Sequence, residues 1–147
     1  MNTDPYKPLP SILELKRLLI GRGFEIYRTV GKKVQLAERV RDNLLMDGNV
    51  AVSTGDWLEL HLVTRAQQGH FPNETEGQLF ERARACGATA EGRGYREVAT
   101  QVVVISDPGN AIKTLDTWYE VTFVREVHDL DELTREAGFA LALDKIA

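Results

Sequence analysis

The stretch GKKVQLAERVRDNLLMDGNVAV, residues 31–52, decides which fold the rest of the chain can adopt. Within it, Leu36, Val40 and Leu44 recur at every fourth position. This spacing is typical of the buried side of a helix, and charged residues occupy the positions between them. We therefore predict a helix over residues 35–46, which the following glycine ends and a strand succeeds.

The beginning of this stretch raises a second question. It opens with Gly31, Lys32 and Lys33, whereas the other helices expected in this chain begin with a capping side chain. If a helix starts here, its first backbone amides and the two lysines form a place where a small anion binds, with Arg28 and Arg39 close enough to assist. The competing interpretation is a hairpin about the glycine, in which the lysines are ordinary surface charges.

The segments on either side alternate between helical and strand-like apolar spacing. Three pairs have the spacing of capping residues at helix starts: Ser11 with Glu14, Asn73 with Glu76, and Asp129 with Glu132. A glycine turn at residues 53–56 separates two strand-like runs and predicts a β-hairpin. The other expected elements are helices at 11–21, 74–86 and 130–142, and strands at 24–29, 57–65, 98–106 and 117–127.

The order of these elements predicts the fold class. Residues 24–106 read β-α-β-β-α-β, which is the order of a ferredoxin-like sheet. We therefore predict an α+β fold with a ferredoxin-like core, an extra N-terminal helix and a C-terminal strand plus helix. The alternative is a curved antiparallel sheet with helices, which resembles the small acidic chaperones of bacterial secretion systems. Prolines make residues 1–10 a flexible tail, and residues 11–147 form a single domain.

Composition excludes several classes of function. The chain has 147 residues, with 18 Lys plus Arg against 22 Asp plus Glu, so its net charge of -4 does not favour nucleic acid as a partner. Cys86 is the single cysteine, which excludes an internal disulfide and fits a cytoplasmic location. No apolar run approaches the ~20 residues of a membrane span. Motifs for phosphate loops, dinucleotides and zinc are missing, so no metal or other cofactor is expected.

A second candidate site combines two predicted strands. Glu25 and Tyr27 lie on the outward face of one strand, and Glu59 and His61 lie on the outward face of another. In the ferredoxin-like order these two strands are neighbours, so the four side chains would form one polar surface. Acids, a phenol and an imidazole together are able to bind a ligand. The competing interpretation is a solvated sheet face.

These observations favour a non-catalytic cytoplasmic module that binds a protein partner or a small anionic ligand. We expect a homo-oligomer, because the strands at 98–106 and 117–127 are apolar on both faces. The alternative is a small enzyme acting on an acidic or phosphorylated metabolite, with His61 as the acid/base and Lys32 and Lys33 as the anion clamp. A pocket that unites the two candidate sites would favour the enzyme, and a flat sheet face would favour the binding module.

Overall fold

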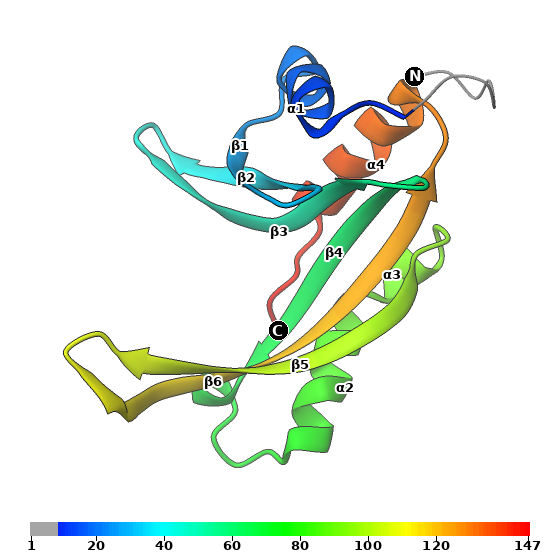
Figure 1. The fold of residues 1–147 in the computed structure, drawn as a ribbon. Helices are drawn as coiled ribbons and strands as arrows, with labels where there is room; N and C mark the ends of the chain where they lie inside the picture. The colour runs from blue at the N-terminus through cyan, green and yellow to red at the C-terminus, as the bar shows by residue number, and fades with distance from the viewer. Residues whose placement is uncertain (1–8) are drawn as a thin grey trace. The chain divides into compact units, whose positions relative to one another are not determined.

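The structure is a computed structural model that describes residues 9–147. Of the predicted tail at residues 1–10, residues 1–8 lie outside the described part of the chain. In the described part, four α-helices accompany an open antiparallel sheet of six strands in the order β1-β2-β3-β4-β6-β5 (Figure 1). The elements are α1 Ile12–Gly21, β1 Ile26–Val30, β2 Lys33–Arg41, β3 Leu44–Thr54, β4 Leu58–Gln67, the 3-10 turn η1 Gln68–His70, α2 Glu76–Cys86, α3 Ala88–Glu91, β5 Arg96–Asp107, β6 Asn110–Val127 and α4 Leu130–Ala142.

The predicted helix at residues 35–46 is wrong, because this segment forms β2 and the beginning of β3. The two strands pair antiparallel, with Leu36 opposite Val50. A spacing of four residues fits a strand, whose period is two, as well as a helix, whose period is 3.6, so the pattern of apolar residues did not distinguish them. The turn at Asp42 and Asn43, both favoured turn residues, is the signal that separates the two strands.

The ferredoxin-like core is also wrong, and the loss of that helix is the reason. A ferredoxin-like sheet needs a helical crossover between its first two strands. Here β1, β2, β3 and β4 follow one another without a helix and pair as sequential antiparallel neighbours. The alternative prediction of an antiparallel sheet with helices agrees with the observed architecture at this level.

Three predicted helices are confirmed, two of them with the expected caps. Ser11 accepts a hydrogen bond from a backbone amide of α1, and Asp129 does the same for α4. In α2 the cap differs from the prediction. Thr75 and Gln78 form a capping box there, in place of the predicted pair Asn73–Glu76. The later cap shortens the helix at its beginning and leaves its predicted end unchanged.

The described chain divides into two compact units. Unit 1 contains the residues up to Leu62 together with Val124–Leu143. Unit 2 contains Val63–Phe123 together with Asp144–Ala147. Each unit has its own helices and buried side chains, and they are described in turn.

The core of unit 1 lies between one face of the sheet and two helices. Helix α1 packs against β2, and α4 packs against β3. Gly48 permits the second contact, because a Cβ at this position would lie 2.6 Å from Leu141 Cδ2. The main buried apolar side chains are Leu15, Leu19, Val34, Leu36, Val50, Val52, Leu58, Leu60, Leu62, Leu133 and Ala137. Their alternation along the strands leaves the opposite sheet face to polar residues.

The core of unit 2 is built around α2. Leu79 and Ala83 are fully buried on this helix. Thr64 in β4 donates a hydrogen bond of 2.6 Å from its hydroxyl to the backbone oxygen of Ala83, which ties the strand to the helix. The fully buried ring of Phe123 packs beside Gly87, where the helix ends.

Candidate functional site

Glu25 and Arg39 were predicted to belong to different sites, but they pair with each other. Arg39 Nε lies 2.8 Å from Glu25 Oε1, and Arg39 Nη2 lies 2.7 Å from Glu25 Oε2. This two-point hydrogen bond lowers the pKa of Glu25 and raises the pKa of Arg39. The pair therefore fixes the entry to β1 against β2, and each charge compensates the other.

The predicted anion site at the start of a helix is not formed, because there is no helix at that position. Val30 pairs with Lys33 across a turn that contains Gly31, whose φ of 58° suits glycine. Lys32 also lies in this turn. Arg28 donates a hydrogen bond to the side chain of the cross-strand residue Gln35. The hairpin interpretation is thus the correct one, and no row of helical amides is available to hold an anion.

The second predicted site is separated into two parts. Strands β1 and β4 are not neighbours, since β2 and β3 lie between them. At about 4.8 Å per strand, this places the two predicted halves roughly 14 Å apart. Tyr27 on β1 is 45% exposed and lies beside Arg28. Glu59 and His61 on β4 instead lie beside residues of β2 and β3.

These residues form a polar cluster on the sheet face opposite the helices of unit 1. Lys33 pairs with Ser53, and Ser53 pairs with Glu59, across three adjacent strands. The hydroxyl of Ser53 lies 2.8 Å from Nε2 of His61. Burial, with a smaller contribution from the charge of Lys33, lowers the pKa of His61 to about 4. We call Lys33, Ser53, Glu59 and His61 the polar sheet cluster.

Sequence reasoning missed Ser53, which it assigned to the turn of the predicted hairpin. The signal was present in the alternation of the strands. Once Thr54 is placed opposite Leu58, the period of two puts Ser53 on the same face as Glu59 and His61. The register of the hairpin was needed for this inference.

The contact between Ser53 and His61 has the form of a nucleophile with its base, in which the histidine is a weak base. A general base works best when its pKa lies near the working pH, and a pKa of about 4 makes His61 a weak proton acceptor. In a serine nucleophile system a third group also orients the imidazole. Among residues 9–147, no side chain or carbonyl is hydrogen-bonded to Nδ1 of His61.

The lowered pKa of His61 predicts how stability changes with pH. In the unfolded chain a histidine titrates near about 6.5, whereas in the folded protein His61 takes up its proton near a pKa of about 4. Between these values the unfolded state binds more protons, so acidification from about 6.5 to about 4 destabilises the folded state. His61→Gln removes this titration. We expect wild type to lose more melting temperature than the variant between about pH 7 and about pH 5.

Thermal unfolding of both proteins across this range measures the difference. The conservative variant Gln35→Asn is the control, since it changes a polar side chain on the same sheet face and leaves the histidine in place. An identical pH dependence in wild type and His61→Gln would mean that His61 is protonated equally well in the folded and unfolded states.

Unit 2 presents a different feature, an apolar surface that no element within residues 9–147 covers. Strand β5 is the last strand in the sheet order. Its alternate residues Val98, Val102 and Val104 are 48%, 47% and 56% exposed. On the adjoining part of β6, Ile112 is 93% exposed and Leu115 is 53% exposed. Ile112 and Leu115 are three residues apart, so they point to opposite faces of this strand. We call these five residues, which lie on both faces of the hairpin, the β5–β6 apolar surface, and Figure 1 shows the two strands as one long hairpin.

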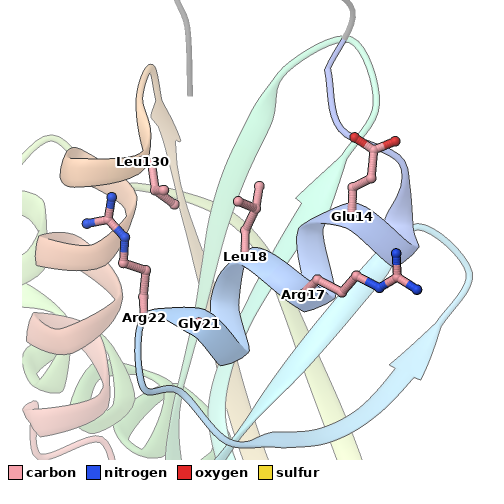
Figure 2. A pocket seen from close by; sticks show the side chains of 6 residues that line it. All are labelled: Glu14, Arg17, Leu18, Gly21, Arg22 and Leu130. Carbon is pink, nitrogen blue, oxygen red and sulfur yellow. The ribbon is translucent and has the colours of Figure 1, made fainter.

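The structure also contains a pocket in unit 1, between α1 and the beginning of α4. Its volume is about 420 Å³. Figure 2 shows the side chains that line it, which are Glu14, Arg17, Leu18, Gly21, Arg22 and Leu130. None of the residues predicted from the sequence to bind a ligand belongs to this lining. The pocket therefore does not unite the two predicted sites.

Within residues 9–147, no group of three or more His, Cys, Asp or Glu side chains is arranged to hold a metal ion. No helix in the same range has the length and apolar character to span a membrane. In comparisons with known protein families, curated proteins and solved structures, no match to this chain was found.

Proposed function

We propose that this protein is a non-catalytic binding module that functions as a homodimer, with β5 of each copy at the interface. One observation carries the proposal, which is the exposure of the β5–β6 apolar surface on a strand at the edge of the sheet. Proteins normally protect such edges with charges, prolines, bulges or a covering element. Residues 98–106 of β5 contain neither a charge nor a proline.

A second copy of the chain is the occupant that fits this edge. An edge strand offers a row of backbone amides and carbonyls, and another strand satisfies them by extending the sheet. Soluble oligomers are most often two-fold symmetric, and an antiparallel pair of identical strands has this symmetry. Because the middle of β5 is neutral, two copies approach without repulsion between like charges. The valines of β5 would then gain apolar cross-strand neighbours from the second copy.

The charges and valines of β5 indicate one register. If the two-fold axis passes through Gln101, Val98 lies opposite Val104 of the second copy, and Thr100 lies opposite Val102 of the second copy. These pairs share the exposed face, since residues of equal parity point to the same side. Apolar and β-branched pairs directly opposite each other stabilise antiparallel strands.

Neighbouring registers are less favourable. An axis through Val102 would place Glu97 opposite Asp107 of the second copy, which are two like charges. An axis through Thr100 would place the charge of Arg96 against the apolar Val104 of the second copy. The register centred on Gln101 brings no two like charges opposite each other: it places Arg96 opposite Ser106 and Glu97 opposite Ile105 of the second copy.

The strand at 117–127 is one of the two segments from which self-association is expected, but its position in the sheet does not favour it as the interface. This segment is the inner part of β6, which lies between β4 and β5. Tyr119, Val121 and Phe123 are buried there, so its apolar faces are already covered. The proposed interface therefore uses β5 and the outer part of β6.

The alternative, a small enzyme acting on an acidic or phosphorylated metabolite, rests on the contact between Ser53 and His61. The weak basicity of His61 and the position of the pocket favour the binding module. The proposal includes a cytoplasmic location, because a protein with one cysteine has no internal disulfide to stabilise it in an oxidising compartment. A dimeric partner chaperone, one of the alternatives suggested by the sequence, is one form that such a module takes.

Sedimentation of wild type and Val102→Lys/Val104→Lys tests the proposal. Both side chains are about half exposed, so the substitutions leave the core of the protomer unchanged. In the dimer they would bring four positive charges together. We expect wild type to sediment as a dimer at micromolar concentration, and we expect the variant to dissociate at least about tenfold more readily.

Val40→Lys is the matched control, because Val40 is 53% exposed but lies on β2 in unit 1. It adds the same kind of charge without touching β5, so its dimer should be as stable as that of wild type. A wild type that remains monomeric throughout the micromolar range would overturn the proposal. So would equal weakening of the dimer by Val40→Lys and by the double variant.

A further inference from the structure

We propose that the pocket between α1 and α4 binds an aliphatic monocarboxylate, with the chain in the pocket and the carboxylate at Arg17. This site lies within unit 1, whereas the proposed dimer interface lies in unit 2, so the two proposals are independent. A volume of about 420 Å³ is within the range of roughly 300–1,000 Å³ that small-molecule sites have.

The apolar part of the ligand is recognised by two leucines. Leu18 comes from the middle of α1, and Leu130 is the first residue of α4. Figure 2 shows them on either side of the pocket, with Gly21 below them on α1. The aliphatic parts of Arg17 and Arg22 extend the apolar lining, since long basic side chains cover apolar surface while their charged ends stay in water.

The charges around the pocket favour an anionic head group at one position. Arg22 is already paired with Asp131, at 3.0 Å. Glu14 lies one helical turn before Arg17, toward the same end of the pocket (Figure 2), and accepts a hydrogen bond of 3.1 Å from the hydroxyl of Ser11. Arg17 forms no ion pair with any residue from 9 to 147. Its guanidinium is therefore the group that a carboxylate can join through a charge-assisted, two-point hydrogen bond.

Gly21 gives a direct way to close the pocket. A Cβ added at this position would meet no atom within 4 Å, and its φ is not in the left-handed region. Gly21→Leu is therefore expected to fit without displacing any neighbour and to favour the helical conformation. Its side chain would extend into the space that the ligand needs, and the amide spectrum of the variant reports whether it is folded.

Amide chemical-shift titration by NMR with octanoate, octanol and octylammonium tests the proposal. For wild type we expect octanoate to bind more tightly than octanol and octylammonium to bind more weakly. Arg17→Gln should weaken the binding of octanoate about three- to tenfold and leave the binding of octanol unchanged, because it removes one partly exposed charge. Gly21→Leu should abolish the binding of both.

Two matched variants serve as controls. Lys16→Gln removes one positive charge from α1 at a residue outside the pocket lining. Gly138→Leu adds the same side chain to α4 at a glycine that also has open space around it. Both should bind octanoate as wild type does. Any of three results would overturn the proposal. They are equal binding of octanoate and octanol, undiminished octanoate binding by Gly21→Leu, and the absence of chemical-shift changes in α1 and α4.

Discussion

Glu120→Ala is expected to lower the free energy of unfolding by about 3–5 kcal/mol, because it leaves a buried guanidinium without its counterion. Glu120 is 6% exposed in β6. Its Oε2 lies 2.7 Å from Arg65 Nη2, and its Oε1 accepts a hydrogen bond of 2.7 Å from Gln101. The guanidinium of Arg65 also stacks on Trp118, 3.9 Å from the ring centroid. Denaturant unfolding measures the change.

The same residues provide the controls for this prediction. Replacing both partners, with Arg65→Met and Glu120→Leu, should restore most of the lost stability, since a buried ion pair contributes little beyond an apolar pair of similar size. Glu74→Ala removes the partner of Arg82 from an exposed ion pair and should have a far smaller effect, because solvent screens that pair. The prediction would be contradicted if Glu120→Ala lowered the free energy of unfolding no more than Glu74→Ala does.

Phe123→Ala is expected to cost about 3–5 kcal/mol, because it removes a fully buried ring from the core of unit 2 and leaves a cavity. The ring lies directly against Gly87. A Cβ on this glycine would come within 2.3 Å of Phe123 Cζ, so Gly87→Ala alone should also destabilise the protein, by about 1–3 kcal/mol of overpacking. Denaturant unfolding of both variants measures these costs.

The double variant Gly87→Ala/Phe123→Ala distinguishes packing from other causes. With the ring removed, the added methyl group meets no clash and fills part of the cavity, so the two costs should combine to less than their sum. Gly138→Ala is the control for adding a methyl group at a helical glycine, because nothing lies within 4 Å of the new atom. Strict additivity would mean that the ring and the glycine do not share the packing contact.

The predicted self-association and the predicted pocket ligand have different consequences for studying the protein. The dimer would pair the edge of β5 and protect its backbone from hydrogen exchange. The carboxylate would instead protect the end of α1 and the beginning of α4. Because these segments belong to different units, exchange measurements on one sample can follow both effects separately.

Local signals in the sequence were sufficient for the helices that have caps and for the tight hairpin. Ser11 and Asp129 specify helix starts through bonds to backbone amides within three residues, and these contacts are independent of the rest of the fold. The alternation of Leu58, Leu60 and Leu62 correctly identified β4 and its buried face. The Gly31 hairpin was also recognised as one of two possibilities, since glycine supplies a positive φ at little cost.

The arrangement of the candidate sites depended on tertiary structure. In residues 31–52 the apolar spacing fits both a helix and a strand, and pairing with β1 and β3 selects the strand by satisfying its backbone groups. That choice separates Tyr27 from His61 and brings Ser53 to the histidine. The pocket likewise combines α1 with α4, more than a hundred residues later in the chain. Composition and spacing report local preferences, whereas strand order and helix packing result from burying surfaces that lie far apart in the sequence.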